Sequence, residues 1–268
     1  MWAYDFIQNA FLASIFASIA CGVIGTYVVV KRMVFLTGGI AHTAFGGLGF
    51  AYLMRFNPFI GALGASWIAT ISMSLLRRFD YSEDTAMGIL WPLGMSLGIL
   101  FVSFSQGYVG DLFAYLFGNI LMVSILDLWI MAILVAFLLL LVIVFFQELQ
   151  ALCFDEEFAK VRGLQTERFY LLLLFLISFS VVVLMKVVGI VLLLALLTIP
   201  AAMSRKWVVS LKANMFMASF LAFAFINVGI MASYYVDVPA GASIVLVACI
   251  TFSLVHLFSW LASVYRRK

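Results

Sequence analysis

The two histidines of the chain, His42 and His256, both fall inside long apolar stretches. A neutral imidazole is a good ligand for zinc, manganese or ferrous iron, so a histidine in such a place is a candidate metal ligand. The alternative is a structural histidine that hydrogen-bonds to a neighbouring carbonyl, and this alternative is stronger for His256. His42 shares one helix face with Gly38 and Gly46 at a spacing of four residues, which leaves room beside its ring.

A second candidate metal contact is Asp111, which together with Asn119 would form an oxygen-rich mouth near a polar, glycine-punctuated segment, residues 105–122. The three cysteines lie far apart and form no CxxC pair, so they indicate neither a zinc knuckle nor a disulfide framework. The sequence has no GxxxxGK[ST] phosphate-binding loop and no Ser/His/Asp or Cys/His constellation. We therefore expect a chain that is not an enzyme and has no permanently bound cofactor.

The acidic residues are placed at the ends of apolar segments or between them, and none lies deep inside one. A carrier coupled to protons or sodium usually needs a buried carboxylate relay. Their absence from the apolar segments weighs against secondary transport.

The elements that position these residues are membrane helices. Of the 268 residues, 66% are hydrophobic and 10% are charged. A water-soluble domain of this length could not bury so much apolar surface. About 20 apolar residues are needed to cross a bilayer. Nine segments qualify: 6–30, 35–54, 59–76, 84–104, 125–146, 168–186, 188–204, 214–236 and 240–264. The stretch 168–204 is either two spans or one span and a half-helix, which would make eight.

These segments predict an all-α, polytopic transmembrane bundle that forms one domain over residues 1–268. If nine spans alternate, 13 of the 15 basic residues lie on the same side, and only Arg55 and Lys186 lie on the other. The positive-inside rule then predicts an N-terminus outside and a C-terminus in the cytoplasm. The polar segment 105–122 is expected at the external face, as an interfacial or re-entrant helix covered by protein.

The second span is unusually rich in small residues, among them Gly38, Gly39, Gly46 and Gly47. Two interpretations stay open: close packing of helix backbones, or a helix that lines a path for a solute.

The longest internal connection, residues 147–167, contains a short predicted helix at 154–163. Asp155 is its expected N-cap, Glu156 and Glu157 lie at the positive end of its dipole, and Gly163 is its expected C′ residue. Its apolar strip consists of Phe154, Phe158 and Val161. A helix of two turns is not stable alone in water, so this strip rests on its own bundle, on the lipid surface or in a groove of a cytoplasmic partner.

Several stretches, in this order, resemble the zinc/manganese/iron-type ABC transporter permeases. They are GVIGTYVVVKRMVFLTGGIAHTAFGGLGF, EDTAMGILWPLGMSLGIL, DLFAYLFGNIL, CFDEEFAKVRGL, KVVGIVLLLALLTIPAAMSR and YYVDVPAGASIVL. The resemblance covers residues 10 to 250 and implies a fold like that of the cobalamin and siderophore importer permeases. It also implies a homodimer in a prokaryotic cell membrane, two separate ATP-binding subunits and an extracytoplasmic metal-binding protein.

Within this resemblance, residues 154–163 match the family's coupling helix, through which the ATP-binding subunits act. The family's intramembrane metal site pairs an aspartate with a histidine four residues later. His42 matches the histidine, but Gly38 stands at the position of the aspartate.

The predicted function is therefore that of the permease subunit of an ATP-driven importer for zinc, manganese or iron, working by alternating access, with a transient contact to His42. ATP is expected to be hydrolysed by the partner subunit. The lipid bilayer is expected to surround the helices, and no nucleic acid is expected as a partner. The alternatives are a secondary metal-ion carrier, a passive channel and a membrane scaffold without transport.

Overall fold

The computed structural model describes residues 5–79, 81–105, 115, 118 and 120–266. Asp111, Asn119 and most of the segment 105–122 lie outside the described residues. The predictions of an external mouth and of a re-entrant helix there are therefore left as predictions.

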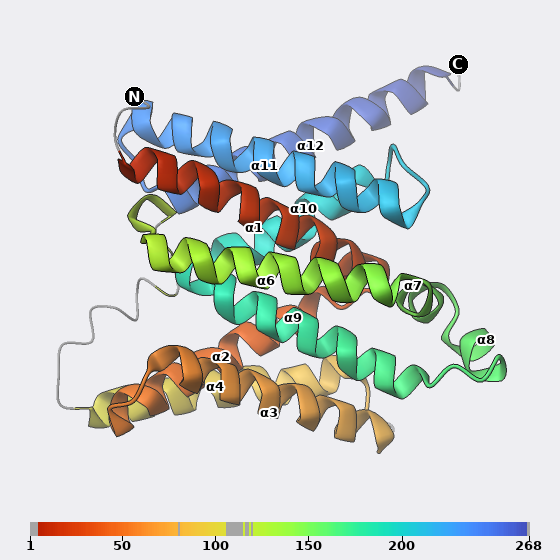
Figure 1. Cartoon of the computed structure of the whole chain (residues 1–268). Helices are drawn as coiled ribbons and strands as arrows, with labels where there is room; N and C mark the ends of the chain where they lie inside the picture. The colour runs from red at the N-terminus through yellow and green to blue at the C-terminus, as the bar shows by residue number, and fades with distance from the viewer. Residues whose placement is uncertain (1–4, 80, 106–114, 116–117, 119, 267–268) are drawn as a thin grey trace.

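The described residues form an all-helical structure, which confirms the predicted fold class (Figure 1). Its α-helices are Asp5–Val30 (α1), Val34–Met54 (α2), Pro58–Arg78 (α3), Glu83–Phe104 (α4), Ile125–Val144 (α6), Phe146–Phe154 (α7), Glu156–Val161 (α8), Thr166–Val188 (α9), Ile190–Ser204 (α10), Leu211–Val236 (α11) and Ala240–Arg266 (α12). A short 3-10 helix, Ile120–Met122 (η1), precedes α6.

Eight of the described helices are long and apolar enough to cross a membrane: α1, α2, α3, α4, α6, α9, α11 and α12. The stretch 168–204 is broken at Gly189, which has φ +82° and separates α9 from α10. α10 has 15 residues, so it rises about 22 Å and is shorter than the hydrocarbon core. This agrees with the alternative of eight spans and a shorter helix.

Serine side chains fix where three of the long helices begin. The Oγ atoms of Ser82, Ser124 and Ser210 each accept a hydrogen bond from the backbone N–H three residues later, at 3.1–3.2 Å. These bonds satisfy N–H groups that a helix start would otherwise leave unpaired. The serines lie between apolar runs, so they set the lengths of α4, α6 and α11.

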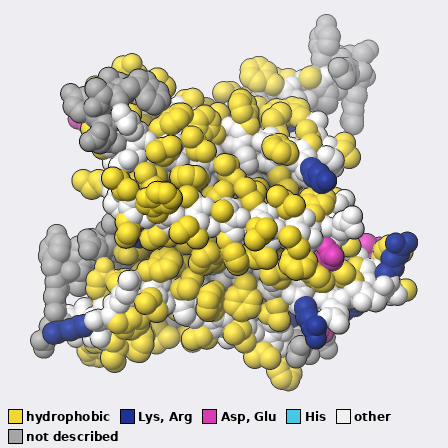
Figure 2. All heavy atoms as spheres, viewed as in Figure 1, with side chains coloured by type: hydrophobic (Ala, Val, Ile, Leu, Met, Phe, Trp, Pro, Cys, Tyr) yellow, Lys and Arg dark blue, Asp and Glu magenta, His cyan; other side chains and the backbone are white. Residues whose placement is uncertain are grey.

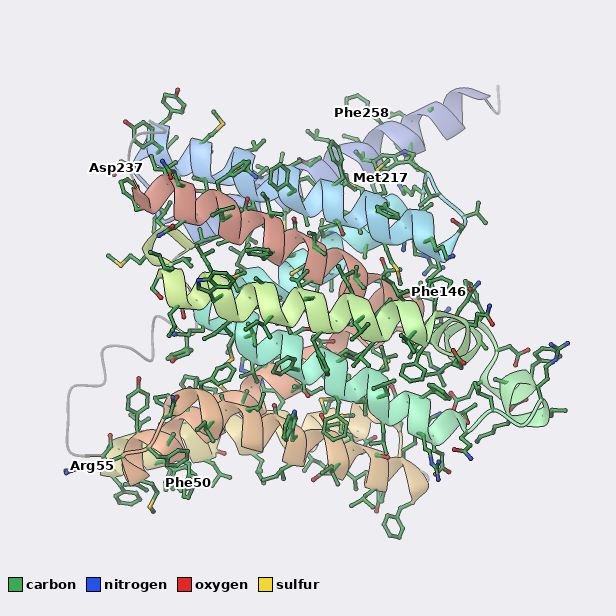
Figure 3. All side chains as sticks on the ribbon, viewed as in Figure 1. Phe50, Arg55, Phe146, Met217, Asp237 and Phe258 are labelled. Carbon is green, nitrogen blue, oxygen red and sulfur yellow. The ribbon has the colours of Figure 1, made fainter. Side chains whose placement is uncertain are left out.

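The helices run side by side between two ends of the molecule. α7 and α8 lie at one end, hereafter the α8 end, where the last helix also finishes (Figure 1). Phe146 lies at this α8 end, whereas Arg55 and Asp237 lie at the opposite end (Figure 3). The visible surface between the ends is mostly hydrophobic, and Lys and Arg side chains gather near its edges (Figure 2). This distribution is that of a protein whose middle is surrounded by lipid.

The connection 147–167 is more ordered than the sequence suggested. α7 occupies Phe146–Phe154, most of which was expected to be loop, and Phe154 ends α7 instead of belonging to α8. Leu149 and Leu152 of α7 are fully buried, so this polar-looking helix is held by two side chains that pack on the bundle. The predicted short helix is thus the second of two consecutive helices.

Candidate functional site

The predicted apolar strip is exposed at the α8 end. Phe154 is 62% exposed, Phe158 53% and Val161 88%. Among the described residues, therefore, the bundle does not cover this strip. Large apolar side chains gathered on a surface of this kind indicate a contact with a partner or with lipid.

Local chemistry fixes the shape of α8 as the sequence predicted. Asp155 caps it, because its Oδ1 accepts a hydrogen bond from the backbone N–H of Phe158 at 2.8 Å. Gly163 follows it at φ +84°, a left-handed backbone that favours glycine. The guanidinium of Arg162 lies 4.7 Å from the centre of the Phe158 ring, which holds that ring at the surface.

Glu156 points the other way, into the bundle. Its Oε2 lies 2.7 Å from the Nζ of Lys31, and its Oε1 lies 2.6 Å from an Nη of Arg77. Lys31 follows α1 and Arg77 belongs to the last turn of α3. One carboxylate therefore joins α8 to two helices that are far away in the sequence.

Two further contacts extend this arrangement. The guanidinium of Arg77 lies over the ring of Tyr170, 4.2 Å from its centre. The hydroxyl of Tyr170 donates a hydrogen bond to Oε1 of Glu83 at 2.7 Å. We call Lys31, Arg77, Glu83, Glu156 and Tyr170 the Glu156 network; it connects α8 with the ends of α1, α3, α4 and α9.

The charge state of Glu156 is stable near neutral pH. Partial burial alone would raise the pKa of Glu156, but the hydrogen bond from Lys31 and the positive charges of Lys31 and Arg77 outweigh it. The net effect lowers its pKa below the usual 4.5. The carboxylate is therefore ionised and paired under physiological conditions.

α7 is attached to the bundle independently. Besides its two buried leucines, Phe146 places its ring 4.7 Å from the Nζ of Lys212 in the first turn of α11. The α7–α8 segment is therefore fixed on its inner side and exposes the apolar strip on its outer side.

The surroundings of His42 form the second candidate site. Its ring stacks on that of Trp91, with centres 4.4 Å apart and planes 17° apart. Its Nδ1 lies 3.1 Å from the Sδ of Met95. Trp91 and Met95 belong to α4 and His42 to α2, so the site spans the contact between these two helices.

The glycines of α2 let neighbouring backbones approach closely. A Cβ built at Gly46 would lie 2.7 Å from the carbonyl oxygen of Gly94, and one at Gly47 would collide with the carbonyl oxygen of Gly61 in α3. A Cβ at Gly39 would collide with the Sδ of Met87. These three positions have a packing role; lining of a path by Gly38 and its neighbours stays a prediction.

Other candidates have less support. The Nδ1 of His256 lies 2.9 Å from the carbonyl oxygen of Phe252 one turn earlier, as expected for a structural histidine. Within the described residues, no group of three or more His, Cys, Asp or Glu side chains is placed so that it could hold a metal ion. A cavity of about 1290 Å³ at the opposite end is lined mainly by apolar side chains of α1, α11 and α12, and His42 is not among them.

Sequence reasoning missed the partners in both sites. It placed Glu156 at the positive end of the short coupling helix and predicted no ion-pair partner for it. It did not single out Lys31, Arg77, Tyr170, Trp91 or Met95 as site residues. The one available signal was charge: Lys31 and Arg77 end apolar spans on the same predicted side as Glu156. Nothing in the spacing links Met95 to His42, 53 residues away.

The fold is that of a polytopic helical membrane protein. The chain belongs to the ABC 3 transport family, whose model matches residues 3–259, and this confirms the resemblance to the ABC transporter permeases. A membrane protein of Synechocystis sp. is 40% identical over 250 residues, which cover 93% of this chain and 89% of that one.

Two further relatives have names that describe their activity or assembly. The manganese transport system membrane protein MntC of Halalkalibacterium halodurans is 34% identical over 258 residues, covering 96% of this chain and 88% of its own. The solved structure of PsaBC from Streptococcus pneumoniae in complex with Fab has a TM-score of 0.85 at 31% identity, covering 94% of this chain and 91% of that chain.

Proposed function

We propose that the chain is the membrane-spanning subunit of an importer of divalent transition-metal ions, driven by ATP that a separate subunit hydrolyses. Two copies would form the permease, with the α8 end in the cytoplasm, and an extracytoplasmic metal-binding protein would deliver the ion. Family membership supports the transporter, and the manganese transport system among the relatives supports a metal cargo. The positive-inside rule supports the orientation.

The observation that carries this proposal is the two-sided α7–α8 segment. Its outer side exposes Phe154, Phe158 and Val161, and its inner side is fixed by Glu156 to Lys31 and Arg77. An apolar strip on a short helix fits a groove on a partner protein. A force applied at the strip would reach α1 and α3 through Glu156 and, beyond them, the α2–α4 contact that holds His42.

In the proposed cycle, the binding protein releases its ion into a vestibule between the two copies. Closure of the ATP-binding subunits moves α8, and the network passes this movement to the ends of four helices. The ion contacts His42 on its way, because an imidazole that is only half-buried is accessible to a cation.

Phe158→Asp tests the docking of the ATP-binding subunit, with Phe158→Leu as the control. A carboxylate at Phe158 would place a charge in an apolar contact, so we expect loss of the ATP-binding subunit from the purified complex and loss of metal uptake. Leucine keeps the apolar contact and should keep both. Full assembly and uptake in Phe158→Asp would contradict the proposal.

A further inference from the structure

We propose that Met95 is a second ligand for the transported ion, and that the His42–Met95 pair makes the permease favour a thiophilic divalent ion of the zinc type over manganese. This inference rests on the proposed function, and it adds a ligand from α4 and a narrower class of cargo.

The distance between the two side chains suits a shared ion. With zinc bonds of about 2.0–2.1 Å to an imidazole nitrogen and about 2.3 Å to a cysteine thiolate, two such ligand atoms of one ion are about 3.3–3.6 Å apart, and a neutral thioether sulfur would lie somewhat farther out. Nδ1 of His42 and Sδ of Met95 are 3.1 Å apart. To bind one ion together, Nδ1 and Sδ must move apart by a few tenths of an ångström. The flexible methionine side chain allows this movement.

Trp91 holds the imidazole toward the sulfur. Its ring stacks on that of His42 at 4.4 Å. The same tryptophan also lies against position 38, where a Cβ would be 3.3 Å from Cζ3 of Trp91. The indole therefore packs beside both Gly38 and the His42 ring.

The two ligand-bearing helices are held closely together at this level. A Cβ at Gly94, next to Met95, would lie 2.9 Å from the carbonyl oxygen of His42 and 2.6 Å from Cα of Thr43. Small residues let the backbones of α2 and α4 approach closely here, which keeps the backbone positions of His42 and Met95 near each other. The nitrogen and the sulfur are therefore presented together in the folded chain.

The chemical type of the two ligands then determines which metal ion the site prefers. Carboxylate and carbonyl oxygens suit magnesium, calcium and manganese, whereas thioether sulfur is a soft ligand and imidazole suits zinc, copper and iron. A pair that lacks the carboxylate and contains a thioether is poorer for manganese and better for a zinc-like ion.

The test uses the whole transporter, with its ATP-binding subunit and binding protein, in cells that lack other importers for these ions. Zinc and manganese are supplied at equal concentration, and the accumulated metals are measured by mass spectrometry. For Met95→Leu we expect zinc accumulation to fall about tenfold or more and manganese accumulation to fall less than about threefold. Met95→Cys should keep zinc accumulation, since it keeps a sulfur ligand.

Met87→Leu is the matched control, because Met87 is buried in the same α2–α4 contact, where its sulfur packs against Gly39. It should leave the ratio of zinc to manganese unchanged. Calorimetric titration of the purified permease with zinc gives a second measurement, in which Met95→Leu and His42→Ala should each weaken zinc binding about tenfold or more.

An equal fall of both ions in Met95→Leu, or zinc binding unchanged by it, would overturn the inference and leave Met95 as a packing residue. This result differs from failure of the proposed function, in which the unaltered transporter accumulates neither ion when its partner hydrolyses ATP.

Discussion

In the proposed mechanism, Glu156 is the residue through which the two candidate sites would be coupled. Its neighbour Glu157 lies on the same short helix but is exposed, whereas Glu156 is held by Lys31 and Arg77. Substitutions at Glu156 and at Glu157 therefore distinguish the loss of a charge on α8 from the loss of the Glu156 network.

Glu156→Gln should uncouple transport from ATP hydrolysis. The amide keeps the shape of the side chain but loses the charge, which weakens both contacts by about 1–3 kcal/mol in total. We expect metal uptake per ATP hydrolysed to fall about threefold to thirtyfold while the ATP-binding subunit stays bound. Uptake and hydrolysis measured in the same proteoliposomes check this.

Glu157→Gln is the control for this experiment and should behave like the unaltered protein. An equal loss of coupling in both variants would show that the charge of α8 matters and that the ion pairs do not.

The stability conferred by Glu156 should depend on pH in a definite direction. Its pKa in the folded protein lies below 4.5, so its contribution is fully present above that pH and is lost as the pH falls through the lower folded value. The unfolding midpoint of Glu156→Gln should lie below that of the unaltered protein at about pH 7, and the difference should shrink below about pH 4.5. A difference that grows on acidification would contradict the assignment of the ion pairs.

At the scale of single residues, the sequence correctly predicted those features that depend on residues a few positions away in the chain. The cap by Asp155 and the left-handed Gly163 follow from chemistry within a few positions of the chain. The partners of Glu156 lie 125 and 79 residues away, and no local pattern could join them. The same holds for His42 and Met95.

The helix α2 is the element against which both α3 and α4 pack. Its glycines allow the backbones of α3 and α4 to approach, as described for Gly46 and Gly47. From the sequence, close packing and lining of a path both remained open for these glycines, because a small residue allows either. The packing role becomes visible in the structure, where carbonyl oxygens of α3 and α4 lie too close for a side chain.

Gly47→Ala should therefore destabilise the protein. The added methyl group collides with the carbonyl oxygen of Gly61, which is backbone and has little freedom to move. We expect a loss of about 1–3 kcal/mol, visible as a lower unfolding midpoint in detergent. Gly64→Ala in α3 is the control, because no described atom lies within 4 Å of its Cβ, and it should unfold at the original midpoint or above it.

The helices themselves were predicted well, because long apolar runs with polar interruptions determine them. The exception is α7. Its Gln147, Glu148 and Gln150 indicated a loop, whereas its two buried leucines and the contact of Phe146 with Lys212 attach it to the bundle. A nine-residue helix with so few apolar contacts is recognisable only once the bundle beneath it is known.

At the scale of the whole molecule, the α8 end combines the basic residues, the Glu156 network and the exposed strip, while the opposite end carries Arg55, Lys186 and Asp237. Lys186 is paired there with Asp127 of α6 at 2.5 Å, which explains a basic residue on the side where few were expected. The long helices between these ends expose much apolar surface, above all α4 and α12. Lipid and a second copy of the chain would cover it in the proposed assembly.

The central claim is that this permease moves a metal ion with energy from a partner bound at the α8 end. The most direct measurement is metal uptake into proteoliposomes that contain the permease and its ATP-binding subunit, with ATP inside and the metal-loaded binding protein outside. We expect the metal to accumulate above its outside concentration, and we expect this accumulation to stop when ATP is omitted or Phe158 is replaced by aspartate. Uptake that proceeds equally without ATP, or that never exceeds the outside concentration, would contradict it.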